Sequence, residues 1–565
     1  MAVPISKFRA ICGIFPVILN FNLIHLPTMK LPPHTLILSI LLLISISASA
    51  QSKQKSVDPK STTMKFNTLM QLINYFYVED VDQPKLTEEA IVAVLKELDP
   101  HSVYISKDEV EKTNEPLVGN FDGVGIQFQI YKDTILVISP VPGGPSEKLG
   151  IQAGDKIIKI NHEDAFGKKV TNQYVLDHLR GPRGTKVDVA IFRKGRKELI
   201  DYTITRDKIP LNSIDASYMV TDNIGYIKLS RFAATSTDEF IDAANSLKKQ
   251  GMKNLVFDLR GNSGGYLNIA FDLADQFLPA GKLVVYTKGV RSPKQDFIST
   301  SSGTFETGKL VVLIDEGSAS ASEIVSGAVQ DWDRGLIIGR RSFGKGLVQR
   351  PYMLPDSSMV RITTARYYTP SGRCIQKSYA DGEEAYGDDL YKRLKHGEMY
   401  HADSIKFPDS LRYFTQNKRV VYGGGGIMPD YFIPLDTTFA SKYYTDVFRK
   451  SLLNEFTVQY IETRRKDLLK TYPDIQAFKK GFTDDQKLLD EFVAFAASKD
   501  LPRNDKDLEA SGLQIKTVLK ALIARNLFNM NGYFEMISAT DDELKQAIDV
   551  IKNDSLFHKL SQNKK

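Results

Sequence analysis

The chain has 565 residues, a formal net charge of +6 and two cysteines, Cys12 and Cys374. Hydrophobic residues make up 42% and charged residues 25%, which is ordinary globular usage and excludes a disordered, collagen-like or coiled-coil chain. So small a charge on so long a chain gives no indication of a nucleic-acid partner. Two cysteines exclude a disulfide framework and a cysteine-rich zinc site.

Residues 36 to 46 form an apolar run, LILSILLLISI, with Lys30 before it and Ala48-Ser49-Ala50 after it. A basic start, a short apolar core and a small-x-small end predict a secretory signal peptide cleaved after Ala50. The run is shorter than the roughly 20 residues that span a bilayer. Because Met29 stands directly before Lys30, residues 1–28 are interpreted as an upstream extension. The alternative is an uncleaved signal that attaches the protein to the inner membrane.

Cleavage after Ala50 would leave 515 of the 565 residues. The first 50 residues contain three basic and no acidic side chains, so the net charge would fall to +3. Only Cys374 would remain, without a partner for a disulfide. The sequence therefore predicts an exported, periplasmic protein.

The mature chain is predicted to begin with a linker and an N-terminal helical region over residues 51–115. Within it, Thr87 is expected to cap the helical run AIVAVLKEL. Residues 116–207 then show short β-rich runs, VGIQFQI, TILVIS, KIIKI, VDVAIF and YTIT, separated by Gly and Pro. One helix-like stretch, NQYVLDHLR, interrupts them.

Residues 208–436 alternate strand and helix patterns, which predicts an α/β domain. The strand candidates are GYIKLS, NLVFDLR, KLVVLID and GLIIG, and the helix candidates include TDEFIDAANSLKK and SASEIVSGAVQDW. Residues 437–565 are charged and helical. Thr483-x-x-Gln486 and Thr540-x-x-Glu543 are interpreted there as capping boxes.

Two serine motifs follow strands of the α/β domain. Gly261-Asn262-Ser263-Gly264-Gly265 fits the G-x-S-x-G pattern of a nucleophile elbow, which also needs a histidine. The downstream histidines lie in charged, loop-like or tail settings. We therefore favour a glycine-rich turn that donates backbone N–H groups to an oxyanion. A histidine-dependent hydrolase using Ser263 remains an alternative.

The second motif, Gly317-Ser318-Ala319-Ser320-Ala321-Ser322-Glu323, places Ser320 where a strand turns into a helix. Free N–H groups at a helix N-terminus stabilise an anion. Lys345 follows in another glycine-flanked turn, Phe343-Gly344-Lys345-Gly346. A neutral lysine can act as the base for a serine nucleophile if burial lowers its pKa from about 10.4. The alternative is a serine that only caps a helix and a lysine at the surface.

The segment FDGVGIQFQI, with GIQAGDKIIKIN and LRGPRGT further on, resembles a PDZ domain. PDZ domains bind an extended peptide C-terminus at a sheet edge. The resemblance implies that Gly123, Val124, Gly125 and Ile126 form the loop that holds the terminal carboxylate. It also implies that Arg180 matches a residue that senses bound peptide.

Together, SASASEI, VQDWD, FGKGLVQ, DLRGNSGG and the upstream PDZ-like segment resemble the carboxy-terminal processing peptidases, also called tail-specific proteases. LDPHS at 98–102 and GGIMPD at 425–430 match further landmarks of that family. The resemblance implies a crotonase-like α/β protease core with an inserted PDZ domain and helical N- and C-terminal regions.

Carried over to this sequence, the resemblance makes Ser320 the nucleophile, Lys345 the general base and Gln349 a residue that orients the lysine. The backbone N–H groups of Ala321 and Gly264 would form the oxyanion hole. Asp331 matches an acidic position of uncertain role.

The resemblance implies a Ser-Lys serine endopeptidase that needs no metal or organic cofactor. Its expected partners are protein substrates with apolar C-termini, an adaptor protein, and further copies of the chain through the helical regions. The rival interpretation is a non-catalytic PDZ adaptor that presents C-terminal tails to a partner.

Overall fold

The computed structural model describes residues 59–561, so the predicted signal peptide and its cleavage point lie outside the described residues. The chain divides into two compact units, the first up to Leu86 and the second from Thr87 to Lys565. Helix α2 (Pro59–Phe76) belongs to the first unit. No helix between residues 59 and 561 is both long and apolar enough to cross a membrane.

The N-terminal helical region begins differently from the prediction. Helix α3 (Gln83–Lys96) starts four residues before Thr87, so Thr87 lies inside the helix and does not cap it. The side chain of Asp82 accepts a bond from the Lys85 N–H at 3.1 Å instead, because an aspartate at this position satisfies a free donor of the first turn. Strand β1 (Val103–Ile105) and helix α4 (Lys107–Val118) follow.

The β-rich segment forms a sheet of order β3-β4-β5-β7-β8, with β6 pairing to β5. Its strands coincide with the predicted runs to within a few residues. They are β3 (Ile126–Tyr131), β4 (Thr134–Pro140), β5 (Lys156–Ile160), β6 (Glu163–Asp164), β7 (Lys186–Phe192) and β8 (Ile200–Thr205). Helices α5 (Pro145–Lys148) and α6 (Asn172–Leu179) join them, and β2 (Asn120–Gly123) pairs with β9 (Asp207–Pro210) at the two ends of the segment. Strand β3 is therefore an edge strand.

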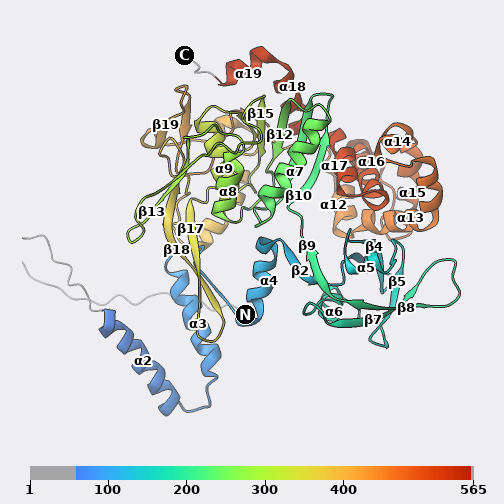
Figure 1. The fold of residues 1–565 in the computed structure, drawn as a ribbon, viewed down its shortest axis with the longest axis horizontal. Helices are drawn as coiled ribbons and strands as arrows, with labels where there is room; N and C mark the ends of the chain where they lie inside the picture. Colours follow the sequence, from blue (N-terminus) through green and yellow to red (C-terminus); the bar gives the residue numbers. More distant parts are fainter. Residues whose placement is uncertain (1–58, 562–565) are drawn as a thin grey trace, which may run out of the picture. The chain divides into compact units, whose positions relative to one another are not determined.

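The α/β domain is built on a six-stranded sheet of order β10-β11-β12-β15-β16-β21 (Figure 1). Neighbouring strands from β11 to β21 are parallel, and β10 is antiparallel to β11. The strands are β10 (Ile214–Met219), β11 (Ile224–Leu229), β12 (Asn254–Asp258), β15 (Leu310–Ile314), β16 (Leu336–Gly339) and β21 (Tyr431–Phe432). The helices α7 (Ser236–Lys249), α8 (Leu267–Asp275) and α9 (Ala321–Asp331) alternate with them.

A second sheet carries a long hairpin beside this core. Its order is β1-β18-β13-β14, and β17 also pairs with β18. The strands are β13 (Leu283–Lys288), β14 (Gln295–Ile298), β17 (Leu347–Met353) and β18 (Met359–Tyr368). The smaller elements that follow are α10 (Glu383–Gly387), α11 (Asp389–Lys395), β19 (Arg412–Phe414) and β20 (Val420–Tyr422). The hairpin matters because Lys345 directly precedes it.

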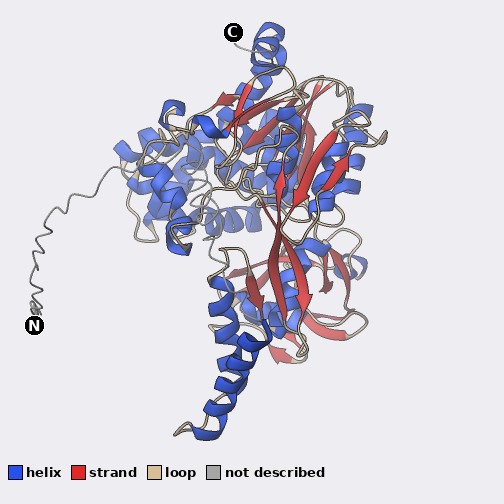
Figure 2. Cartoon of the chain, turned by 90° about the vertical axis from the view of Figure 1, so that its left-hand side faces the viewer, coloured by secondary structure: helices blue, strands red, loops and turns tan. Residues whose placement is uncertain are grey.

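The C-terminal helices divide between two hydrophobic cores. Helices α12 to α16 enclose a core to which Met536 of the next helix also contributes, and Figure 2 draws them, like all helices, in blue. They are α12 (Lys442–Arg449), α13 (Leu452–Thr471), α14 (Ile475–Gly481), α15 (Asp485–Ala497) and α16 (Asp505–Leu527). Helices α17 (Met530–Ile537), α18 (Asp542–Lys552) and α19 (Asp554–Ser561) follow.

Helix α18 packs on the six-stranded sheet of the α/β domain itself. All five residues of β15 are buried, as expected for a strand covered on both faces. Leu310, Val312 and Ile314 face the core that contains α7 to α9. Val311 and Leu313 belong to the opposite core, which contains Leu544, Ala547, Val550 and Ile551 of α18. The C-terminal region thus supplies the second cover of the sheet.

Neither predicted capping box forms, because each helix begins one residue later than expected. Helix α15 is preceded by Asp484 and not Thr483, and α18 by Asp541 and not Thr540. The Asp541 side chain accepts from the Leu544 N–H at 3.0 Å, because aspartate is at least as good an N-cap as threonine. Glu543 is consequently not the closing residue of a capping box, and its carboxylate is free to bind arginines.

Candidate active site

Ser320 and Lys345 line one cavity of about 360 Å³. The cavity is also lined by Gln349, by the turn around Gly264 and by Arg361 of β18. Ser320 follows β15 and directly precedes α9, as predicted. Its backbone has φ 54° and ψ −110°, a conformation that residues other than glycine rarely adopt. Such strain at a strand-to-helix turn is typical of an exposed nucleophile.

Lys345 is set into the wall of this cavity. Burial lowers the pKa of its ammonium group, and the positive charge of Arg361 lowers it further, while Glu323 and Asp99 oppose the shift. No carboxylate lies within ion-pair distance of its Nζ in the part of the chain that the structure describes. A lysine in this setting releases its proton more readily than a lysine in water. It is therefore suited to act as a base.

A buried carboxylate ties the two turns together. Glu323, in the first turn of α9, accepts a bond from the Ser320 N–H at 2.8 Å. It also accepts from the Lys345 N–H at 2.9 Å, the Gly344 N–H at 2.7 Å and the Ser342 hydroxyl at 2.5 Å. Burial raises the pKa of Glu323 to about 7, and the four donors oppose this rise. The carboxylate holds the backbones of Ser320 and Lys345 at a fixed spacing.

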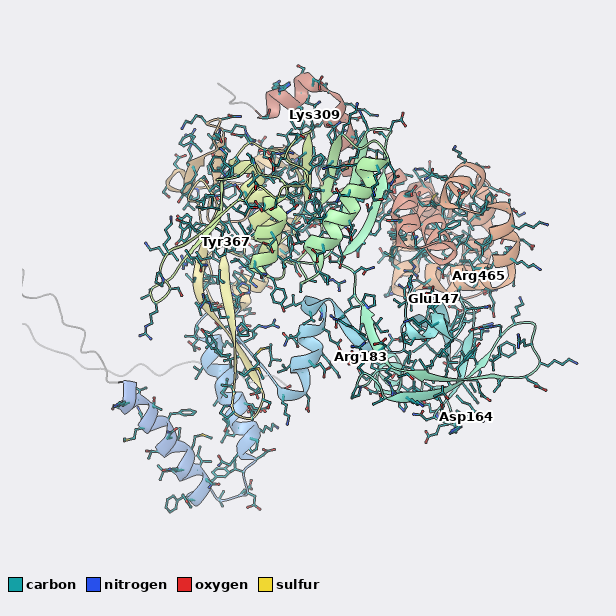
Figure 3. The ribbon with its side chains drawn as sticks, in the orientation of Figure 1. Glu147, Asp164, Arg183, Lys309, Tyr367 and Arg465 are labelled. Carbon is teal, nitrogen blue, oxygen red and sulfur yellow. The ribbon has the colours of Figure 1, made fainter. Side chains whose placement is uncertain are left out.

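A tyrosine makes a second link between the same two segments. The Tyr367 hydroxyl lies 3.1 Å from the carbonyl oxygen of Ser320 and 2.8 Å from that of Lys345. Tyr367 is fully buried on β18, and Figure 3 labels it. Nothing in the sequence pattern indicated this role, because the tyrosine lies 47 residues from Ser320 and meets it only through the fold.

The predicted orienting residue Gln349 lines the cavity and donates to the Thr363 hydroxyl at 3.2 Å. Thr363 in turn donates to Asp99 at 3.1 Å, and its N–H bonds to the Ser102 hydroxyl. Asp99 and Ser102 belong to the LDPHS segment, to which the sequence assigned no role. The segment supports the hairpin that carries Gln349.

The two predicted oxyanion donors differ in availability. The Ala321 N–H has no acceptor among the described residues, and it lies at the N-terminus of α9. The Gly264 N–H, in contrast, donates to Asn262 Oδ1 at 2.9 Å. The next N–H of the turn, that of Gly265, has no acceptor within residues 59–561. Gly264 nevertheless lies against Ser320, since a Cβ added to it would stand 2.9 Å from the Ser320 Cβ.

Ser263 is exposed at the edge of the same cavity. No histidine of residues 59–561 lines it, so the histidine that an elbow at Ser263 needs is absent there. His101 lies within electrostatic range of Lys345, but its ring nitrogen is paired with the Tyr386 hydroxyl at 2.8 Å. The geometry favours the turn as a donor of N–H groups.

Asp331 does not line the cavity. It is buried and paired with Arg373 at 2.7 Å, and it accepts from the Thr369 hydroxyl at 2.5 Å and the Ser371 N–H at 3.0 Å. The aspartate therefore anchors the loop after β18 rather than contacting reacting atoms.

The predicted carboxylate-binding loop lies between β2 and the edge strand β3. Gly123 ends β2 and Ile126 begins β3. Between them, the N–H groups of Val124 and Gly125 have no acceptor among the described residues. An edge strand with free N–H groups at its start is the geometry that peptide addition requires.

Arg180 follows α6, and its side chain lies beside Gly123 of that loop and reaches helix α4. It forms an ion pair with Glu115 at 2.5 Å and lies 4.2 Å from the ring centre of Phe121. The neighbouring residue Asn114 lines the cavity that contains Ser320 and Lys345. Arg180 therefore contacts the helix that borders the cavity.

Comparisons with known proteins agree with this architecture. A family model described as Peptidase family S41 matches residues 223–383, and a PDZ domain model matches residues 123–204. The N-terminal domain of the activating protease CtpB matches residues 43–109, and a family of unknown function matches residues 443–529. The fold and these matches define a peptidase with a PDZ domain, as predicted.

Several characterised proteins are similar over most of their own length. The carboxy-terminal processing protease CtpA of Bacillus subtilis is 33% identical over 60% of this chain and 72% of its own. CtpB of the same organism is 34% identical over 66% and 76%. The chain belongs to the carboxy-terminal processing protease family, and the predicted family and fold class are confirmed.

Among solved structures, the photosystem II D1 C-terminal processing protease is 28% identical, covering 57% of this chain and 91% of that chain, with a TM-score of 0.33. The peptide-bound PDZ domain of a carboxy-terminal protease from Vibrio cholerae is 30% identical, covering 16% of this chain and 99% of that chain, with a TM-score of 0.15. Because both TM-scores are low, the assignment rests on the sequence matches.

Proposed function

We propose that this protein is a serine endopeptidase in which Ser320 is the nucleophile and Lys345 the general base. One observation supports the proposal above all. A strained serine and a lysine of lowered pKa line one cavity, and Glu323 holds their backbones at a fixed spacing. A hydroxyl needs such a base to become a nucleophile.

The reaction is an acyl transfer. Ser320 Oγ attacks the carbonyl carbon of the scissile bond while Lys345 Nζ takes the hydroxyl proton. The C–N bond then breaks, and Lys345 returns the proton to the leaving amine. Water attacks the resulting ester, and Ser320 is restored. The reaction itself calls for no metal or organic cofactor.

The negative oxygen of the tetrahedral intermediate needs donors. The free N–H of Ala321 supplies one, and the turn at residues 264–265 supplies the other. The Gly265 N–H is the better candidate, because the Gly264 N–H must first release Asn262. Each such donor contributes roughly 3–4 kcal/mol to stabilising the transition state.

Substrate selection falls to the PDZ domain. An apolar C-terminal tail would add to the edge of β3, with its carboxylate on the N–H groups of Val124 and Gly125. The ion pair between Arg180 and Glu115 supports a link from this domain to the catalytic cavity. Tail binding would then change the position of α4 beside the cavity.

A cleavage assay separates this function from a non-catalytic adaptor. The full chain and three variants, Ser320→Ala, Lys345→Ala and Ser263→Ala, are incubated with a protein that ends in apolar residues. We expect loss of cleavage in the first two variants and retention in the third. Cleavage by Ser320→Ala at the wild-type rate would contradict the proposal. Tail binding without any cleavage by the wild type would favour the adaptor.

Export to the periplasm is proposed on the residues before position 51. The run LILSILLLISI and the following Ala48-Ser49-Ala50 support a cleaved signal. N-terminal sequencing of the protein from its native host should start at Gln51. A start upstream of residue 36 in the membrane fraction would favour the anchor.

Self-association through the helical regions also stays a proposal. Several large apolar side chains of α2 are exposed, including Met64 at 68% and Tyr75 at 76%, which supports a partner surface there. Sedimentation of the full chain would show whether it forms oligomers.

A further inference from the structure

Three neighbouring parallel strands carry the proposed machinery. Strands β12, β15 and β16 each end six residues before a residue of the site, namely Gly264, Ser320 and Lys345. The carboxyl ends of adjacent parallel strands lie at one edge of a sheet. The relative positions of these three turns therefore decide whether nucleophile, base and oxyanion donors meet.

Each turn has a charged side chain near its start, on the strand side of the site. These are Arg260 after β12, Glu316 after β15 and Arg340 after β16. Arg340 Nε donates to Glu316 at 2.8 Å, which links the second and third turns. No ion pair in the described chain joins the first turn directly to the third.

Helix α18 provides that missing link. Glu543 accepts from Arg260 Nη1 at 2.6 Å and, through its other oxygen, from Arg340 Nη1. Asp541 accepts from Arg260 at 2.9 and 2.7 Å through its two oxygens. These side chains are largely shielded from water, at 8% exposure for Arg340 and 11% for Glu543. Removing one partner of such a pair leaves a poorly solvated charge behind.

The helix that bears these carboxylates is firmly placed. Leu544, Ala547, Val550 and Ile551 of α18 are buried against the sheet. The helix lies outside both the S41 match at 223–383 and the match at 443–529. Its contacts with the turns are thus a feature of the C-terminal region, which the sequence left without a role.

We propose that Asp541 and Glu543 are positioning residues that hold the three catalytic turns in the geometry required for acyl transfer. The proposal rests on the Ser320–Lys345 mechanism proposed above. It assigns to the C-terminal helix an effect on the reaction rate in addition to its packing. Displacements of about 1 Å at reacting groups can cost a hundredfold in rate.

The test compares Glu543→Gln with Asp542→Asn in the full chain. Asp542 is the neighbouring acid, but it is exposed and paired only with Lys545 at the surface. We expect kcat to fall about tenfold to a hundredfold in Glu543→Gln with KM changed less than about twofold, and no change in Asp542→Asn. Binding of a C-terminal tail peptide should equal that of the wild type. A midpoint of thermal unfolding above the assay temperature establishes that Glu543→Gln is folded during the assay.

Arg340→Lys is the second variant. It keeps the positive charge but loses the guanidinium fork that reaches both Glu316 and Glu543. It should lower kcat in the same direction. Wild-type kcat in folded Glu543→Gln and Arg340→Lys would overturn the proposal. The proposal would also be overturned if these variants yield less folded protein but the fraction that is folded keeps the wild-type kcat. Ser320→Ala with wild-type activity would instead overturn the proposed function itself.

Discussion

At the scale of single residues, the site depends on the protonation of Lys345. Burial and the charge of Arg361 both lower the pKa of this lysine below its ordinary 10.5. In the proposed mechanism the neutral form is the active base, so kcat/KM should rise with pH and level off below 10.5. The unfolded chain binds the proton more tightly, so this group also makes the folded state more stable as pH rises toward 10.5.

Arg361→Gln tests this electrostatic account. Removing a positive charge beside Lys345 should raise the lysine pKa, so the rising limb of the pH–rate profile should move to higher pH. Activity at pH 7 should fall accordingly. Arg350→Gln, an exposed position on the same hairpin, should leave the limb in place. A limb that does not move in Arg361→Gln would show that the arginine charge does not act on the base.

Among residues that do not contact substrate, Glu323 is the one whose substitution should lower cleavage and stability most. The Glu323 carboxylate now accepts hydrogen bonds from backbone N–H groups on both of its oxygens. In Glu323→Gln, an NH₂ group would replace one of these oxygens and face N–H donors. Leaving buried donors unpaired costs about 1–3 kcal/mol each. Urea denaturation should show lower stability, and cleavage should be nearly lost. Exposed Glu384→Gln serves as control, and equal behaviour of the two variants would refute the role.

At the scale of elements, the turn after β12 must pass close to Ser320. A Cβ at Gly264 would lie 2.9 Å from both the Ser320 Cβ and the Ala319 carbonyl oxygen. Gly261 in the same turn also has a positive φ, but a Cβ there meets nothing within 4 Å. Gly264→Ala should therefore lose about a hundredfold in kcat, and Gly261→Ala should lose little. Similar kcat values for the two variants would argue against this close approach.

Regular elements could be predicted because their signals are local. The β-branched run KIIKI and the apolar run of KLVVLID, each bounded by turn residues, predict strands locally, and both strands form as expected. Helix starts were less predictable, since α15 and α18 begin after Asp484 and Asp541 and not after the neighbouring threonines, and Asp541 caps the Leu544 N–H. Ser320 and Lys345 could be proposed because the resemblance carried their motifs. Tyr367 could not be assigned a role, because its partners lie far away in the sequence. Glu323 has a local partner in the Ser320 N–H, which the spacing S-x-x-E could have indicated, but its bonds to the turn of Lys345 are distant.

At the scale of the whole molecule, the protease sheet needs the C-terminal helix to cover its second face. Leu544→Ala removes a side chain that is 2% exposed, and it should cost about 2–5 kcal/mol of unfolding free energy. Lys545→Ala, on the solvent side of α18, should cost little. Thermal and urea unfolding of both variants measure the difference. Equal stability would mean that α18 is not part of the protease core.

In the proposed mechanism, Ser320 forms an acyl-enzyme with the help of Lys345. The protein is mixed with a peptide ester substrate, and the reaction is quenched in acid during turnover. The acyl group then stays on the nucleophile, and mass spectrometry of a proteolytic digest locates it. The account predicts acylation of Ser320 in the wild type and in Ser263→Ala, and none in Lys345→Ala. An acyl group on Ser263, or undiminished acylation of Ser320 without Lys345, would contradict it.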